Sequence, residues 1–234
     1  MKILAVDTAT ESCSVAIIEG GSLSAEITIL KDQTHSKHLM ELIDSGLGMS
    51  GLNAADLDGL AVTAGPGSFT GLRIGISTIK GLAHALDKPV VGLSSLEVLA
   101  WQCADRSCLI CPMLDARKSE VYWATYRYAD DILTRQSPEN VGAPEAAVQE
   151  IKEPCVFIGS GAQLYRQRLS TALGDLAHFA PENQNIIRGS SVAFLSMERF
   201  ETRDSVEAAD LVPHYIRRSD AELNLGDDRL SKKS

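Results

Sequence analysis

The amino-acid sequence predicts an α/β fold of two lobes, each opening with a β-meander and continuing with alternating helices and strands. The chain has 234 residues and is 44% hydrophobic, enough to bury a sizeable core in one compact unit or two small lobes. Segments with strand-like and helix-like hydrophobic periods follow one another along it. The second half starts as the first does, with an apolar strand, an aspartate, a short polar link and another strand.

The first lobe is expected to begin with a meander. Strand-like runs occupy residues 2–7, 13–18 and 22–30, and the polar link "TATES" joins the first two. A helix is predicted over residues 36–51, with Ser36 as a possible N-cap. Its apolar stripe consists of Leu39, Leu42, Ile43 and Leu47.

A strand, a tight turn and a long helix follow in the run "DGLAVTAGPGSFTGLRIGIST". The helix is predicted because apolar residues recur at steps of four and three from Leu72 to Leu86. Beyond it come a strand over 90–95 and a helix over 95–105. These elements complete a first lobe over residues 1–104.

The second lobe is predicted over residues 105–220, and the polar end of the chain, 221–234, is expected to be disordered. In the run "CLICPMLDARKSEVYWATYRY", Asp115 is the counterpart of Asp7. Further on, Gly159 and Gly161 end an apolar strand directly before a helix-like segment.

Composition and charge exclude several classes of protein. Asp7 comes too early for a signal peptide, and the chain has no apolar run of about 18 residues, so we expect a cytoplasmic protein without a membrane span. Five cysteines fit reduced thiols rather than a disulfide scaffold. The net charge of -9 disfavours independent binding to RNA, because phosphate binding depends on Lys and Arg.

The turn "GPGSFT" between strand and long helix is the most specific local feature. Gly65 and Gly67 permit positive φ angles, and Ser68 or Thr70 can cap the helix. Arg73 either completes an anion site with the helix N-terminus or points to solvent. The turn lacks the Lys-Ser/Thr of a Walker A loop, so a capped strand-to-helix turn is the favoured interpretation.

Other reactive side chains do not form a pattern typical of catalysis. Cys108 and Cys111 lie three apart in a predicted buried strand and therefore point to opposite faces, which argues against a cluster or a redox pair. The chain contains no Gly-x-Ser-x-Gly sequence, which weakens a serine-hydrolase hypothesis. Lys118 and Glu120 are interpreted as a charged hairpin rim.

The strand-aspartate-turn arrangement of both lobes resembles the superfamily of actin, sugar kinases and heat-shock ATPases. In that superfamily the phosphates of a nucleotide lie between paired hairpin turns, which here implies a cleft with Asp7, Thr8, Gly159 and Gly161. The alternative stays open that the aspartates merely end strands and the glycines merely form turns.

A more specific resemblance is carried by five motifs and covers the chain up to about residue 218. They are "MKILAVDTAT", "HSKHLMELI", "AGPGSFTGLRIG", "MLDARKSEVYWATY" and "LVPHYIRR". This combination resembles the TsaB family, bacterial proteins required to make threonylcarbamoyladenosine in tRNA.

The resemblance implies a non-catalytic scaffold or activator. Its partners would be a TsaD-like subunit, which transfers threonylcarbamoyl to N6 of the adenosine next to the anticodon in tRNAs reading codons that begin with A, and a TsaE-like ATPase. Contact with tRNA would be made only through the complex, and a homodimer stays open. No cofactor is expected to bind tightly, although ATP or ADP with magnesium is compatible with the cleft or a partner interface. The alternative is an enzyme of the same fold, a phosphotransferase or a metallopeptidase, acting alone.

A metal site is not expected. The resemblance implies a catalytic relative with two helix-borne histidines at i and i+4, but here Leu39 stands four residues after His35, and the nearby His38 has the wrong spacing. His35 and His38 are therefore predicted not to be ligands.

The same resemblance implies that the first lobe meets the TsaD-like partner. We hypothesise that the free edges of the helix over 36–51 and of the long helix after the turn form the partner surface. We therefore expect folded but non-binding Leu39→Glu and Gly75→Arg variants. The predicted partner surface comprises His35, Leu39, Leu42, Ile43, Ser68, Phe69, Thr70, Gly71, Arg73 and Gly75.

Overall fold

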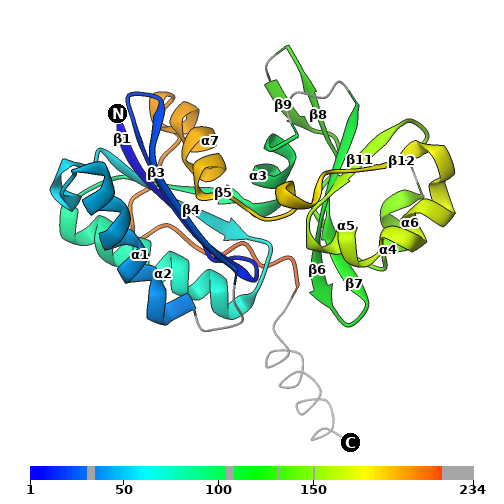
Figure 1. The fold of residues 1–234 in the computed structure, drawn as a ribbon, viewed down its shortest axis with the longest axis horizontal. Coiled ribbons are helices and arrows are strands. Elements are labelled where there is room, and N and C mark those ends of the chain that lie inside the picture. The colour runs from blue at the N-terminus through cyan, green and yellow to red at the C-terminus, as the bar shows by residue number, and fades with distance from the viewer. Residues whose placement is uncertain (31–34, 104–107, 131, 150, 218–234) are drawn as a thin grey trace, which may run out of the picture.

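The computed structural model describes residues 1–217 except 31–34, 104–107, 131 and 150. The expected disordered tail and the proposed lobe boundary at residue 104 lie outside this description, as do the side chains of residues 35–37. Figure 1 shows two lobes side by side, each built around one sheet. The predicted α/β fold of two lobes is therefore confirmed.

The first sheet has the strand order β3-β2-β1-β4-β5. Strands β1, β2 and β3 form the expected antiparallel meander, and β4 and β5 extend the sheet parallel to β1. The strands are β1 (Lys2–Asp7), β2 (Ser12–Glu19), β3 (Ser22–Leu30), β4 (Gly59–Gly65) and β5 (Val90–Ser94).

Helices cover both faces of this sheet, so β1 is apolar on both sides. Leu4 and Val6 pack toward α1 (His35–Ser50) and α2 (Phe69–Leu86), whereas Ile3 and Ala5 face a second core. That second core includes α3 (Ser95–Trp101) and α7 (Gly189–Glu201). The short 3₁₀ helix η1 (Ala54–Asp56) precedes β4.

The second sheet has the order β10-β7-β6-β11-β12, and β8 pairs with both β6 and β9. The expected hairpin is formed by β6 and β7, and β11 runs parallel to β6. Its strands are β6 (Leu109–Arg117), β7 (Glu120–Trp123), β8 (Tyr126–Ala129), β9 (Ile132–Arg135), β10 (Asn140–Gly142), β11 (Cys155–Ile158) and β12 (Ala177–Phe179). The other elements of this half are α4 (Pro144–Val148), α5 (Ser160–Leu164), α6 (Arg166–Leu173), η2 (Gly174–Leu176) and η3 (Glu182–Gln184).

The chain then returns to the first lobe, which the division at residue 104 did not anticipate. Helix α7 falls within the range expected for the second lobe, but it packs on β1 and β2 of the first sheet. Residues 205–217, which we call the C-terminal strap, follow it and run along the first lobe toward the junction (orange in Figure 1). By packing, both segments belong to the first lobe.

Glu26 on β3 anchors this return. Its carboxylate accepts hydrogen bonds from the backbone N–H of Ser190, at 2.9 Å, and from Arg188 Nη2, at 2.7 Å. Burial acts to raise the pKa of Glu26, but the hydrogen bonds from Arg188 and Ser190 outweigh it and hold that pKa below its usual value. The carboxylate thereby satisfies donors at the N-terminus of α7.

The cysteines behave as small hydrophobic residues. None of the five, all of which the structure describes, forms a disulfide, and four of them are buried while Cys108 is half-buried. Contact with Cys111 and burial both raise the pKa of the Cys155 thiol, which opposes thiolate chemistry. Across the described part of the chain, no helix is both long enough and apolar enough to span a bilayer.

Candidate functional site between the lobes

The N-terminal half of α2 lies directly on the turn between β1 and β2. Glycines recur every fourth residue on this side of the helix. A Cβ atom would lie 2.3 Å from Ala9 O at Gly67, 2.0 Å from Thr8 O at Gly71 and 2.3 Å from Thr8 Oγ1 at Gly75. Only glycine permits this approach, so the small residues admit the chain's own turn.

Two hydrogen bonds hold the helix in that position. The Ser68 backbone N–H donates to Ala9 O at 2.8 Å, and Thr8 Oγ1 donates to Gly71 O at 2.7 Å. Ser68 Oγ also accepts from the Gly71 N–H at 3.3 Å, so the predicted N-cap is Ser68, while Thr70 lies inside the helix. The short polar joint therefore fixes α2 against the turn.

Gly65 and Gly67 of the turn "GPGSFT" are needed for different reasons. Gly65 has a φ of 124°, and a Cβ there would lie 2.5 Å from His214 O in the C-terminal strap. Gly67 is not among the residues with positive φ, so the positive φ that glycine permits there is not adopted. Its side chain is excluded by the contact with Ala9 instead.

Asp7 lies beneath this joint with its side chain fully buried. Thr63 Oγ1 donates to Asp7 Oδ1 at 2.6 Å, and the Ala9 N–H donates to the same oxygen at 3.2 Å. Burial raises the pKa of Asp7 to about 7, although these hydrogen bonds act in the opposite direction. The carboxyl is shielded from solvent, and its Oδ1 is already engaged by two donors of the chain.

The turn of the second lobe that contains Gly159 and Gly161 is also in close contact with other groups of this chain. Gly159 has a φ of 104°, and a Cβ there would lie 2.4 Å from Met113 O. Its backbone N–H donates to Asn185 Oδ1 at 2.7 Å. A Cβ at Gly161 would approach Leu114 C to 3.0 Å. Both glycines thus serve the packing of α5 against β6, and the N–H of Gly159 is already occupied.

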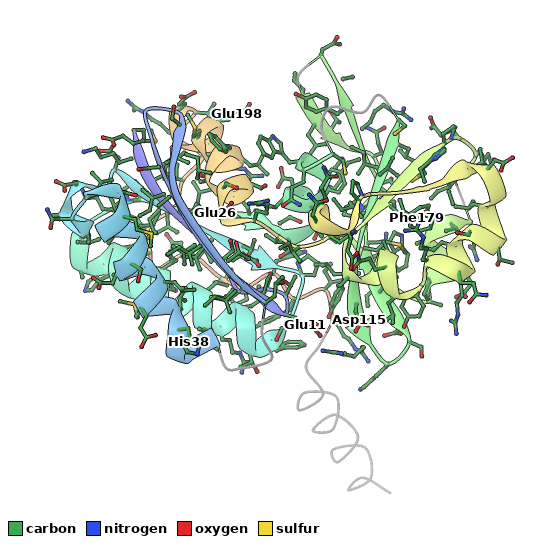
Figure 2. The ribbon with its side chains drawn as sticks, viewed as in Figure 1. Glu11, Glu26, His38, Asp115, Phe179 and Glu198 are labelled. Atoms are coloured by element: carbon green, nitrogen blue, oxygen red, sulfur yellow. The ribbon has the colours of Figure 1, made fainter. Side chains whose placement is uncertain are left out.

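The structure does bring the two aspartate turns to one junction, as Figure 2 shows for Glu11 and Asp115. Arg117 joins them, with Nη2 at 2.9 Å from Glu11 Oε1 and Nη1 at 3.4 Å from Asp115 Oδ2. The hairpin tip is strained, because Arg117, Lys118 and Ser119 have φ angles of 61°, 53° and 60°.

The apolar members of the predicted partner surface are buried in this chain. Leu39, Leu42 and Ile43 are 1%, 7% and 2% exposed, within the core between α1 and the sheet. Gly71 and Gly75 are covered by Thr8. As a correction, we now expect Leu39→Glu and Gly75→Arg to disrupt the fold.

The remaining members lie at or near the surface. Ser68, Thr70 and Arg73 are exposed. Phe69 is half-buried, and its ring stacks on that of Tyr215 with 4.8 Å between centroids. Arg73 Nε donates to Tyr215 Oη at 3.1 Å. The start of α2 thus offers a polar and aromatic surface.

His38 of α1 has no set of metal ligands around it among the described residues. The side chain of His35 lies outside the described residues, and His38 Nδ1 lies 3.4 Å from Glu41 Oε2. Leu39, at the position of a second ligand, is in the core. Within the described ranges, no group of three or more His, Cys, Asp or Glu side chains could hold a metal ion. These residues do not fit the metal that the catalytic relatives imply.

Sequence reasoning missed four residues that connect distant segments: Glu26, Glu139, Arg188 and Arg217. Their partners lie far away in sequence, for example 162 positions between Glu26 and Arg188. Charge type alone cannot indicate such pairs. The one usable signal was the motif "LVPHYIRR", which marks the strap segment that contains Arg217.

Comparison with known proteins agrees with this geometry. The family model described as "TsaD: tRNA N6-adenosine threonylcarbamoyltransferase" matches residues 26–225. Two solved structures from Pseudomonas aeruginosa resemble this chain, each with a TM-score of 0.81. One is described as YeaZ and is 28% identical to this chain, and the other is described as similar to peptidase YeaZ and is 27% identical. Each comparison covers 92% of this chain and 99% of the other. The fold and the family model thus define a two-lobed α/β protein of the family described as tRNA N6-adenosine threonylcarbamoyltransferase.

Curated relatives narrow this class. The chain is 35% identical to the tRNA threonylcarbamoyladenosine biosynthesis protein TsaB of Bacillus subtilis, over 95% of this chain and 96% of the relative. The Escherichia coli protein of the same name is 36% identical over 70% of this chain and 74% of its own length. The chain belongs to the TsaB family.

Proposed function

We propose that this chain is a non-catalytic scaffold or activating subunit in tRNA threonylcarbamoyladenosine biosynthesis. The observation that carries this proposal is that residues expected to bind a nucleotide make contacts within the chain instead. Asp7 is buried beneath α2, and the Gly159 N–H is bonded to Asn185. The groups that a nucleotide and its magnesium ion would need are therefore engaged within the chain. The names of the relatives supply the pathway in which such a subunit acts.

The catalytic partner would be a TsaD-like subunit that carries the transfer of threonylcarbamoyl to adenosine N6. A TsaE-like ATPase would join this pair, and tRNA would be bound through the complex. The net charge of -9 supports this division, because a polyanion is held mainly by Lys and Arg of whichever subunit binds it. ATP or ADP with magnesium would bind at a partner interface and not tightly to this chain alone.

The partner surface would use the exposed side of α1 and the start of α2. Met40 and Met49 are 51% and 73% exposed on α1, although the apolar stripe of that helix is buried. Nine positions separate them, which places them on opposite flanks of the helix, so we assign only Met40 to this surface; exposed methionines are common at association surfaces. Phe69 and Arg73 would continue this surface at the start of α2.

An independent enzyme of the same fold, a phosphotransferase or a metallopeptidase, is the competing hypothesis. The description of one Pseudomonas aeruginosa neighbour mentions a peptidase, but that wording concerns the neighbour alone. Either activity would require the chain to bind nucleotide or metal by itself. The burial of Asp7 and the core position of Leu39 argue against both.

Reconstitution tests the proposal. Purified TsaD-like and TsaE-like proteins from the same organism, with an activated threonylcarbamoyl donor and tRNA, should form modified adenosine only when this chain is added. Met40→Glu should lower binding to the TsaD-like subunit at least tenfold, as expected for a charge in a buried interface. Ser170→Glu, on the exposed surface of α6, is the matched control.

Two outcomes would contradict the proposal. One is full modification in the absence of this chain. The other is stoichiometric binding of ATP with magnesium, or of zinc or iron, by the isolated chain in titration calorimetry and metal analysis. Metal that stays bound to the isolated parent chain, but is lost in His35→Ala or His38→Ala, would favour the enzyme hypothesis.

A further inference from the structure

The C-terminal strap is firmly attached to the first lobe. Val206 and Val90 exchange two backbone hydrogen bonds, at 2.9 and 3.0 Å. Lys80 Nζ on α2 donates to the carbonyl oxygens of Ala209 and Leu211, at 3.0 and 3.1 Å. The strap is thus an added layer of this lobe and not a loose terminus.

The strap then reaches the junction at His214. Its backbone N–H donates to Ala64 O at 2.7 Å, which holds it on the first lobe. Its side chain points the other way, with Nε2 at 3.2 Å from Glu139 Oε2 in the second lobe. One residue therefore contacts both lobes.

Glu139 depends on the first lobe for its neighbours. Its side chain is only 5% exposed, and within its own lobe Arg135 Nη1 lies at 3.8 Å. The hydroxyl of Ser94 donates to Glu139 Oε1, and Ser94 also caps α3. A buried carboxylate is costly without partners. Here Ser94 of the first lobe supplies a hydrogen bond to Oε1, whereas Oε2 lies close to the His214 ring but accepts no hydrogen bond. This carboxylate therefore favours a single arrangement of the lobes.

Three residues further on, Arg217 makes a second attachment. Its Nη1 donates to Ala116 O at 3.2 Å and lies 3.0 Å from Glu120 Oε2. Both groups belong to the β6–β7 hairpin, and the Arg217 side chain is only 20% exposed. His214 and Arg217 therefore tie the strap to two separate parts of the second lobe.

We propose that the C-terminal strap is a clasp that holds the two lobes in one fixed relative orientation. Rotation of the lobes would break the contacts of His214 with Glu139 and of Arg217 with the hairpin together, because one segment carries both. The clasp acts together with the apolar core that α3 and α7 share with the second sheet, and it needs no nucleotide. This goes beyond the proposed role in the pathway, and it is tested on the isolated chain.

The distance between the lobes measures the clasp directly. Spin labels on keto amino acids at Ser77 of α2 and Ser170 of α6, both exposed, avoid the five native cysteines. In the parent protein, electron double resonance should give one narrow distance distribution. The double variant with His214→Ala and Arg217→Ala should at least double the width of the distance distribution.

Two further variants complete the design. Val212→Ser changes a strap residue that is 68% exposed and should leave the distribution unchanged. Glu139→Gln with Glu120→Gln weakens the same contacts from the second lobe, leaves the strap intact, and should broaden the distribution as the first pair does. It also serves if the alanine pair does not fold, as judged by circular dichroism. A distribution as narrow as the parent's in a folded pair would overturn the proposal.

Discussion

The two strand-aspartate-turn units of this chain have the same sequence pattern and opposite environments. Asp7 is fully buried beneath α2, and burial raises its pKa to about 7. Asp115 is 18% exposed in its side chain and pairs with Arg117 at 3.4 Å. The first turn is covered because Gly67, Gly71 and Gly75 let the start of α2 approach it closely, whereas the tip of the second is exposed. A pattern shared by two lobes therefore does not imply a shared role.

The largest expected effect comes from filling the contact between α2 and the first turn. Gly75→Arg places a long charged side chain where a Cβ would already lie 2.3 Å from Thr8 Oγ1. We expect a loss of more than about 5 kcal/mol in the free energy of unfolding, enough to unfold a typical domain. Urea denaturation followed by circular dichroism measures it.

Gly81→Arg is the matched control for this prediction. It lies on the same helix, and a Cβ there would meet nothing within 4 Å. The variant should fold normally and gain slightly from helix propensity. Equal stability of the two arginine variants would mean that α2 does not cover the turn as described.

Asp7→Asn probes the buried carboxyl through pH. The pKa of Asp7 is raised in the folded state from 3.8 to about 7. The stability that the neutral carboxyl contributes is therefore fully present below about pH 4. That stability is lost as pH rises from about 4 to 7, by up to about 4 kcal/mol for a shift of this size. Asp7→Asn should remove this slope in urea denaturation between pH 4 and 8.

Thr63→Val sharpens the same test. It removes the hydroxyl that donates to Asp7 at 2.6 Å and so should move the window of lost stability to higher pH. An unchanged pH profile in Asp7→Asn would show that this carboxyl is not the titrating group.

A smaller effect, of opposite sign, is expected at the second turn. Ser119 has a φ of 60° at the tip of the β6–β7 hairpin, where glycine is favoured. Ser119→Gly should therefore stabilise the protein by about 1 kcal/mol. Thermal unfolding should show a raised midpoint, and a lowered midpoint would contradict the left-handed assignment.

The smallest effect concerns the contact between the two turns. Arg117 Nη2 lies 2.9 Å from Glu11 Oε1, but the two side chains are 74% and 75% exposed. Solvent screens such a pair, so Arg117→Ala should change stability by less than about 0.5 kcal/mol. A larger loss in urea denaturation would indicate that this exposed bridge, and not the strap, holds the junction.

Much of the fold and part of the candidate site could be predicted from local patterns. The meander of β1 to β3, the helices α1 and α2 and the N-cap at Ser68 follow from hydrophobic period and capping chemistry. The pairing of α7 with the first sheet does not. Its anchor, Glu26 with Arg188, joins residues 162 positions apart, and no local pattern encodes such a partner.

The sequence by itself determined the α/β class, the order of elements and the family of this chain, because period, turn chemistry and motifs are local properties. Only the tertiary structure decided what the small residues of α2 face, whether Asp7 is charged, and which lobe holds the end of the chain. A glycine indicates that something comes close, but not whether it is a partner or the chain's own turn. Likewise, the charge of a carboxyl depends on the solvent and donors around it, which are set only when distant segments pack together.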